Sequence, residues 1–188
     1  IVAVLESRWA LSLDQHLEEL AHHHCEARSP QAAQWCLRSA EAAAGLFQFE
    51  QSVAWADRGL ELLDLATVPD ATVQCDLLIA RAIGQRGIEF QTPITSTQVA
   101  FEAAAALGDR DRMARALMTA GLPTTGALAE ENVAFRRDAL ARLGDLDSVD
   151  RWMAECWMLG VERVGPELTL AEHRRRIDSI AAHLDPAD

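Results

Sequence analysis

Apolar residues recur at the spacing of an α-helix along nearly the whole chain of 188 residues. In the segment 13–25, for example, Leu13, Leu17 and Leu20 fall on one face of a helix. No segment shows the alternation of β-branched and polar residues, bounded by turn residues, that predicts a β-strand. The sequence therefore predicts an all-α protein of about eight or nine helices joined by short connections.

Turn residues and capping residues divide this pattern into separate helices. Ser29 is expected to cap a helix that carries Pro30 in its first turn, and Thr95 or Ser96 to cap the helix that ends at residue 107. The other ranges expected to be helical are 13–25, 30–45, 48–67, 72–85, 110–120, 128–143, 148–161 and 170–184.

These helices are expected to pair as antiparallel hairpins that stack into a right-handed superhelix. The chain is rich in alanine, which lets helix axes approach closely and suits stacked hairpins better than one large core. Short sequence motifs that recur along the chain favour the same arrangement, because repeats of about 34 to 46 residues are typical of helical solenoids. The recurring motifs are Val-Ala-aromatic at 53–55, 99–101 and 133–135, and Leu-Gly-Asp at 107–109 and 143–145.

The whole chain, 1–188, is expected to form one helical-repeat domain. Its parts are N-terminal helices at 1–28, hairpins at 29–68, 71–109 and 110–145, and a C-terminal hairpin at 146–185. The sequence starts at Ile1, inside an apolar run, and not at a methionine. We therefore expect the domain to be part of a longer polypeptide.

The segment 33–64 resembles a tetratricopeptide repeat (TPR). Ala40 stands at the small position of the first helix of such a repeat, Phe49 at the aromatic position that opens the second helix, and Gly59 at the small position near its end. Ser52 departs from the pattern, because alanine is usual at that position. The resemblance implies a TPR-like stack of helical hairpins.

A longer stretch of motifs carries a second resemblance. The motifs are Leu-Glu-Glu-Leu-Ala-His-His at 17–23, the hairpin 40–63, Leu-Leu at 77–78, Leu-Gly-Asp at 107–109 and Ala-Leu-Ala-Arg-Leu-Gly at 139–144. This stretch is similar to the helical-repeat region of large actinobacterial transcriptional regulators of the LuxR and MalT type, in which an AAA/STAND ATPase module precedes the repeats. The resemblance implies a cytoplasmic, non-enzymatic segment that senses an inducer or a protein partner and couples that signal to the other domains.

The composition excludes several classes of function. All 17 basic residues are arginine, against 29 acidic residues, which gives a formal charge of −12 and disfavours direct contact with nucleic acid. The absence of lysine excludes P-loop and Schiff-base chemistry in this segment. No apolar run reaches the roughly 18 residues of a membrane span. Cys25, Cys36, Cys75 and Cys156 lack metal-binding spacing, so we expect reduced thiols. Cys25 and Cys36 could meet across a helical hairpin, but a disulfide is disfavoured there.

The densest group of metal-ligating residue types consists of His16, His22, His23, His24 and Cys25. On a helix these side chains diverge and only His16 and His23 share a face, so we expect no metal site. Carboxylates facing each other across a cleft, or a nucleophile beside a base, are not recognisable either. The sequence therefore predicts no enzymatic activity and no cofactor.

Five aromatic residues are candidates for binding a partner or ligand. Trp55, Phe101 and Phe135 occupy matching helix positions, where they either anchor a peptide or apolar ligand on a concave surface or pack between hairpins. Trp152 and Trp157 lie five residues apart, which is about 140° around a helix, so they cannot both point into the same core. One of this pair is expected to be exposed for an interaction.

The run 173–176 is the single basic stretch of the chain. Arg174 and Arg175 in it either form a solvated face or contact a following domain or an acidic partner surface. The function expected overall is a protein-interaction and signal-coupling segment of a bacterial transcriptional regulator. The alternative is a small-molecule (inducer) sensor with an apolar pocket between the helices, lined by the aromatic residues.

Overall fold

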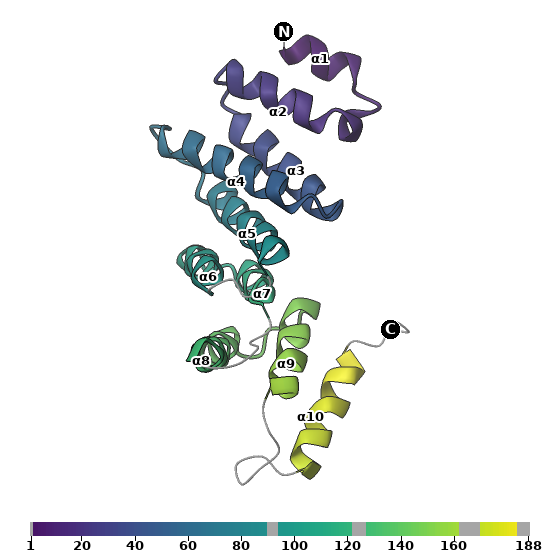
Figure 1. The fold of residues 1–188 in the computed structure, drawn as a ribbon, viewed down its shortest axis with the longest axis vertical. Helices are drawn as coiled ribbons and strands as arrows, with labels where there is room; N and C mark the ends of the chain where they lie inside the picture. The colour runs from purple at the N-terminus through teal and green to yellow at the C-terminus, as the bar shows by residue number, and fades with distance from the viewer. Residues whose placement is uncertain (1, 90–93, 122–126, 162–169, 184–188) are drawn as a thin grey trace. The chain divides into compact units, whose positions relative to one another are not determined.

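The computed structural model describes residues 2–89, 94–121, 127–161 and 170–183 (Figure 1). Within these ranges the chain forms ten α-helices and one short 3₁₀ helix, with no β-strand, which confirms the all-α prediction. The helix that the sequence pattern did not resolve is α1 (Val2–Arg8). In the described part of the chain, no helix combines the length and the apolar character that crossing a membrane requires.

The helices belong to two compact units that divide after Glu89. Unit 1 contains α1, the 3₁₀ helix (Leu13–Gln15), α2 (Leu17–Glu26), α3 (Ala32–Gly45), α4 (Phe49–Asp64) and α5 (Ala71–Ile88). Unit 2 contains α6 (Thr95–Leu107), α7 (Arg110–Met118), α8 (Ala127–Leu143), α9 (Val149–Val161) and α10 (Leu170–His183). The boundary falls inside the range 71–109 that the sequence indicated as one hairpin, so α5 and α6 lie in different units.

In unit 1 each helix packs against its neighbour in the chain, and α3 also packs against α5 (Figure 1). Trp55 of α4 contacts three clusters of buried apolar side chains in this unit. These clusters include Leu20 of α2, Leu37 of α3 and Leu77 of α5, which are all buried. One half-buried indole ring therefore joins the core contributions of four helices.

Glycine allows α4 to lie close to both α3 and α5. A β-carbon built on Gly59 would lie 2.7 Å from Cδ2 of Leu77 and 3.1 Å from Cβ of Cys36. Ala40 and Ser52, two further small residues of the TPR-like segment, are 0% exposed. Because larger side chains would not fit at these points, the helix backbones approach each other there.

In unit 2, α6 pairs with α7, and α9 packs against α7, α8 and α10 (Figure 1). The α6–α7 junction contains a buried polar pair, in which the hydroxyl oxygens of Thr97 and Thr119 are 2.7 Å apart. Thr119 also donates a hydrogen bond to the carbonyl oxygen of Ala116 at 2.7 Å. These buried hydroxyl groups therefore have partners inside the protein.

Ser29 does not cap α3, contrary to the sequence prediction. The helix begins at Ala32, and its N-cap residue Gln31 makes no side-chain hydrogen bond. The Ser29 hydroxyl instead lies 2.7 Å from Nδ1 of the buried His24 and accepts a weak hydrogen bond from the Gln31 N–H at 3.3 Å. A buried imidazole nitrogen requires a hydrogen-bond partner, and Ser29 supplies it.

The expected cap of α6 is also wrong. The helix begins at Thr95 itself, so neither Thr95 nor Ser96 precedes it, and Ile94 occupies the N-cap position without a side-chain hydrogen bond. Aspartates cap two other helices instead. Asp70 accepts hydrogen bonds from two N–H groups in the first turn of α5, at 2.9 and 3.1 Å, and Asp109 accepts one in the first turn of α7 at 3.0 Å. Both satisfy N–H groups that have no partner within the helix.

The segment 13–25, expected to be one helix, is interrupted. Its first residues form the 3₁₀ helix at 13–15, and α2 starts at Leu17. Between them, the ring of His16 stacks on that of Trp9, with 4.1 Å between the centroids. This tertiary contact with the segment after α1 accompanies the break, which apolar spacing alone could not indicate.

Replacing Gly84 by alanine should destabilise unit 1. A β-carbon at Gly84 would lie 2.7 Å from Cγ2 of Val53 and 3.0 Å from the carbonyl oxygen of Phe49, which belongs to the backbone of α4 and cannot turn away. We expect Gly84→Ala to lower the free energy of unfolding by about 1–2 kcal/mol, despite the better helix propensity of alanine. Urea denaturation followed by circular dichroism measures this change.

Gly45→Ala is the matched control, because nothing lies within 4 Å of a β-carbon at the exposed Gly45. Alanine there should leave stability unchanged or raise it slightly. A Gly84→Ala protein as stable as the parent would contradict the close approach of α4 and α5.

Candidate functional site

The aromatic residues expected on a concave surface pack between helices. Phe101 of α6 is 0% exposed, and its ring meets that of Phe135 of α8 edge-on, 5.6 Å between centroids. The guanidinium of Arg142 lies 4.8 Å from the centre of the Phe101 ring and donates hydrogen bonds to both carboxylate oxygens of Glu102, which lower the pKa of that group. Trp55 is half-buried in the core of unit 1. In this conformation these rings serve packing.

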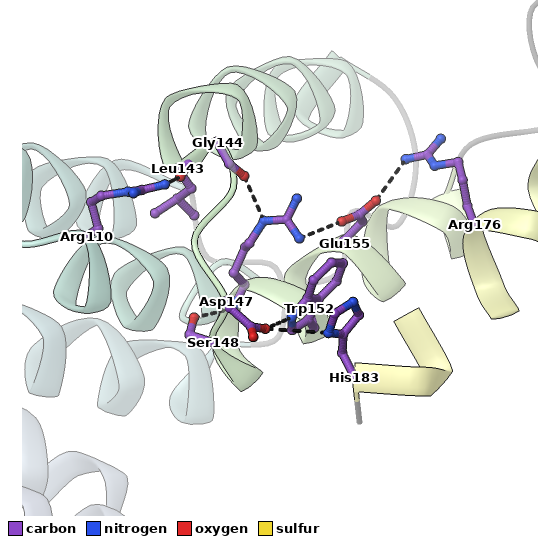
Figure 2. A network of polar contacts seen from close by, with 10 residues as sticks. Arg110, Leu143, Gly144, Asp147, Ser148, Trp152, Glu155, Arg176 and His183 are labelled. Atoms are coloured by element: carbon purple, nitrogen blue, oxygen red, sulfur yellow. Dashed lines mark hydrogen bonds and ion pairs between the residues drawn. The ribbon is translucent and has the colours of Figure 1, made fainter. Parts of the chain in front are cut away.

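Trp152 lies in a network of polar contacts in unit 2 (Figure 2). Its indole Nε1–H donates to Oδ1 of Asp147 at 2.7 Å, and its ring stacks on that of His183 with 4.0 Å between centroids. The same carboxylate oxygen lies 3.6 Å from Nδ1 of His183. The three side chains therefore connect the α8–α9 turn and α9 to α10, and the indole ring is half-buried.

Two arginines bind the C-terminal end of α8. Arg110 of α7 donates to the carbonyl oxygen of Leu143, and Nε of Arg151 of α9 donates to that of Gly144 at 3.0 Å (Figure 2). A guanidinium at this end of a helix satisfies free carbonyl groups and interacts favourably with the helix dipole. Arg110 also pairs with Asp145 at 3.0 Å, and this hydrogen bond lowers the pKa of the Asp145 carboxyl.

A cavity of about 150 Å³ adjoins this network. Glu155 lies in its wall, 3.1 Å from Nη1 of Arg151 and 3.8 Å from Nη2 of Arg176, so its carboxylate already neutralises part of the local charge. The cavity is smaller than the roughly 300–1,000 Å³ of typical ligand sites, and we place no ligand there. Arg174 and Arg175 lie exposed on α10.

Trp157 of α9 lies beside a buried arginine that sequence reasoning missed. Arg136 is 1% exposed, and its guanidinium lies 5.2 Å from the centre of the Trp157 ring. It donates to the side-chain oxygen of Asn132 at 2.6 Å and to the carbonyl oxygens of Ala120 and Gly121 after α7. Trp157 is half-buried, as Trp152 is. The two rings pack against different residues, Trp157 against Arg136 and Trp152 against His183.

His24 is buried, whereas its neighbour His22 is exposed. The ring of His24 stacks on that of Trp35 with 5.1 Å between centroids, and Nε2 lies 3.3 Å from Oε1 of Glu6. Burial lowers the pKa of His24, and the nearby Glu6 carboxylate opposes this shift in part. The described residues contain no group of three or more His, Cys, Asp or Glu side chains placed to hold a metal ion.

Unit 1 contains a cavity of about 620 Å³ between the α2–α3 turn and the C-terminal end of α4. Most of its wall is apolar, from Pro30, Ala32, Ala33, Leu62, Leu63, Leu65 and Ala66. Its polar or ionisable wall residues are Cys25, Arg28, Ser29 and Arg58. A cavity of this volume, with apolar walls and a few polar groups, has the properties of a small-molecule site.

Two thiols meet beside this cavity. The Sγ atoms of Cys25 and Cys36 are 3.4 Å apart across the α2–α3 hairpin, and both thiols are free. Cys25 is 6% exposed and Cys36 is 0% exposed. Arg58 also lines this cavity, and its guanidinium donates a hydrogen bond to Glu61 at 3.1 Å, which raises the pKa of Arg58.

Two residues in unit 1 adopt a left-handed backbone conformation without being glycine. Arg28, with φ of 46°, lies two residues after the end of α2, and Phe47, with φ of 59°, lies two residues after the end of α3. In unit 2 the corresponding turns after α6 and α8 have Gly108 at 68° and Gly144 at 59°. A residue with a side chain is less stable in this conformation than glycine, by about 1 kcal/mol. Arg28 lines the cavity and Phe47 is 80% exposed, so both unfavourable positions hold a large side chain at a surface.

No known protein family, curated protein or solved structure matches this chain. Its functional residues are therefore assigned from their own chemistry and surroundings. The sequence did not indicate three residues as candidates for a site, namely Phe47, Arg28 and Arg58. The helix expected over 30–45 ends at Gly45, as predicted, and Phe47 takes the left-handed position two residues later.

Acidification should destabilise unit 1 through His24. The pKa of His24 in the folded protein lies below the ordinary value of 6.5. As the pH falls through 6.5, the unfolded chain therefore binds a proton at this position before the folded protein does. The stabilising contribution is present above pH 6.5 and decreases as the pH falls towards the folded-state pKa.

His24→Asn should flatten the pH dependence of the free energy of unfolding, measured by urea denaturation between about pH 5 and 8. His22→Asn at the exposed position should leave the slope unchanged. An unaltered slope in His24→Asn would show that another group causes the acid sensitivity.

Phe47→Gly should stabilise unit 1 although it removes an aromatic ring. Phe47 contacts Phe49 edge-on, with 6.0 Å between centroids, but it is mostly exposed. Relief of the left-handed backbone should raise the free energy of unfolding by about 0.5–1 kcal/mol. The reciprocal change Gly108→Ala should lower it by about 1 kcal/mol. Thermal unfolding of both variants measures these changes, and a less stable Phe47→Gly protein would mean that packing of the ring outweighs the backbone term.

Proposed function

We propose that this chain is a non-enzymatic protein-interaction and signal-coupling segment of a multidomain bacterial transcriptional regulator, and that it binds a partner through the turn between α3 and α4. The observation that carries the proposal is Phe47, an aromatic side chain that is 80% exposed on an unfavourable backbone. Leu46 beside it is 69% exposed. Apolar side chains held outward at a cost in stability are typical of binding surfaces.

Phe47, Leu46 and Phe49 form what we call the α3–α4 apolar patch. Phe49 is half-buried, and its ring packs on Gly87 of α5, where a β-carbon would overlap the ring. Packing against Gly87 therefore holds the Phe49 ring in place, and the same ring meets that of Phe47 edge-on. A surface that is already ordered loses little conformational entropy when a partner binds.

Acidic residues flank the α3–α4 apolar patch along the chain. Glu41 precedes it and Glu50 follows it, both exposed, and the chain as a whole has a formal charge of −12. The complementary partner is an amphipathic helix or peptide whose apolar anchors are flanked by basic residues. A neighbouring domain of the parent chain or a separate protein can present such a segment.

The packing of the α3–α4 hairpin supports the TPR-like part of the proposal. Ala40 and Ser52 are 0% exposed, and Gly59 lies against α5, at positions where the resemblance to a tetratricopeptide repeat expects small residues. Within unit 1 each helix packs on its neighbours along the chain. In repeat proteins, where each hairpin contacts only adjacent ones, a change at one hairpin acts first on the next. This property suits signal coupling in a cytoplasmic regulator of the LuxR and MalT type.

Binding of a small-molecule inducer is a second candidate function, favoured by the cavity of about 620 Å³ in unit 1. A ligand that binds only the folded protein raises its melting temperature, and the rise grows with the logarithm of ligand concentration relative to Kd once the site is mostly occupied. Leu62→Trp, which places a larger side chain in the cavity wall, should abolish that rise for a cavity ligand. It should leave binding at the α3–α4 apolar patch unchanged, so the two functions are distinguishable.

A photo-crosslinking amino acid placed at position 47 in living cells tests the proposed partner site. We expect a discrete protein adduct whose crosslinked segment, identified by mass spectrometry, is amphipathic and basic. The same amino acid at Ala54, an exposed position on α4, is the control and should give no such adduct. A synthetic peptide of the captured segment should bind Phe47→Gly at least about tenfold more weakly than the parent protein. Adducts that are absent, or identical at positions 47 and 54, would overturn the proposal.

A further inference from the structure

We propose that Cys25 and Cys36 form a redox-active pair in which a peroxide oxidises Cys25 within the unit 1 cavity and Cys36 then closes a reversible disulfide between α2 and α3. The oxidant is hydrogen peroxide or a small organic hydroperoxide. This modification site is independent of the α3–α4 apolar patch and of any partner that binds there.

The two sulfur atoms are already in contact. Their separation of 3.4 Å leaves a movement of little more than one ångström to the S–S bond length of about 2.05 Å. Cys25 lies at the end of α2 and Cys36 within α3, two helices that pack against each other. A disulfide between them therefore needs only a local adjustment of side chains and helix ends.

The surroundings distinguish the two thiols. Cys25 lies in the wall of the cavity of about 620 Å³, whereas Cys36 is 0% exposed behind it. A water molecule occupies about 30 Å³ in the liquid, so a peroxide molecule fits the cavity easily. Cys25 is therefore the thiol that meets an oxidant first, and Cys36 can react only with Cys25.

A guanidinium group stands beside the thiol that reacts first. Arg58 and Arg28 both line the cavity whose wall contains Cys25. A nearby cation favours the thiolate, which is the nucleophilic form of cysteine. Arg58 is a positioning residue in this scheme, since it stabilises the reactive form of Cys25 and does not itself exchange electrons.

The protonation of Cys36 fits the second step. Burial raises the pKa of the Cys36 thiol, and a negative charge on Cys25 would raise it further. Once Cys25 has become a sulfenic acid it carries no charge. The repulsion that opposed ionisation of Cys36 is then gone when Cys36 has to react.

The reaction balances in two steps. The Cys25 thiolate attacks one oxygen of the peroxide, the O–O bond breaks, and Cys25 becomes a sulfenic acid while hydroxide (an alkoxide, from an organic hydroperoxide) leaves and takes up a proton. The sulfur of Cys36 then attacks the sulfur of Cys25, the S–O bond breaks, and the hydroxyl leaves as water with the Cys36 proton. Two electrons pass from the two thiols to the peroxide, and a dithiol reductant reverses the change.

The remaining cysteines serve as internal controls. Cys75 of α5 is 0% exposed, and burial raises the pKa of the half-buried Cys156 thiol in unit 2. Neither is placed in the wall of the unit 1 cavity. Both should therefore react with peroxide more slowly than Cys25.

Treatment of the 188-residue chain with hydrogen peroxide tests the proposal. We expect the intact mass to fall by two hydrogen atoms, the number of free thiols to fall from four to two, and peptide mapping to show the Cys25–Cys36 bond. Dithiothreitol should restore all four thiols. Oxidation that reaches Cys75 or Cys156 first, or a mass that rises by oxygen atoms without forming the bond, would overturn the proposal.

Variants separate the two steps. Cys36→Ala should accumulate a sulfenic acid at Cys25, trapped by dimedone, and Cys25→Ser should leave Cys36 unreacted, while Cys156→Ser should form the disulfide at the parent rate. Arg58→Met should slow oxidation several-fold, and Arg38→Met, at an arginine of α3 paired with Asp14, should not. Dimedone labelling at Cys36 in the Cys25→Ser protein, or an unchanged rate in a folded Arg58→Met protein, would contradict the assigned roles.

Discussion

The close approach of α4 to α3 and α5 at Gly59 is the contact on which the rest of unit 1 depends. A side chain at this position would meet Leu77 of α5 and the β-carbon of Cys36, so the absence of one sets the spacing of three helices. That spacing lets Trp55 reach three apolar clusters. It also places Arg58, the residue before Gly59, beside Cys25 in the cavity wall. The same tight helix contact therefore lies beside Cys36 and beside the cavity wall that contains Cys25.

The helices of the two units end in different ways. In unit 2 the left-handed turns after α6 and α8 are made by glycine, and arginines satisfy the carbonyl groups at the end of α8. In unit 1 the equivalent turns hold Arg28 and Phe47, which are less stable there but present a cation to the cavity and a ring to solvent. Sites that sacrifice local stability are more often functional than structural. This contrast within one sequence is the reason for proposing binding sites in unit 1.

Most helices could be predicted from apolar spacing, because burial of one face imposes a period that is visible in any window of the sequence. The expected ranges for α8 and α9 differ from the observed bounds by one residue at most. The sites could not be predicted in the same way. Arg136 follows the pattern of a surface residue beside Arg137, and only the carbonyl groups of Ala120 and Gly121, brought close by folding, make it a buried residue. The unit 1 cavity likewise combines segments 25–33 and 58–66, which no local pattern connects.

The α2–α3 turn is bracketed by the two neighbouring thiols. A covalent link between them would enclose this turn in a short ring and remove about 3 kcal/mol of chain entropy from the unfolded state. The same ring contains Arg28 and Ser29 on the rim of the cavity. A disulfide at this position would therefore restrict the backbone of the segment that carries these two cavity residues.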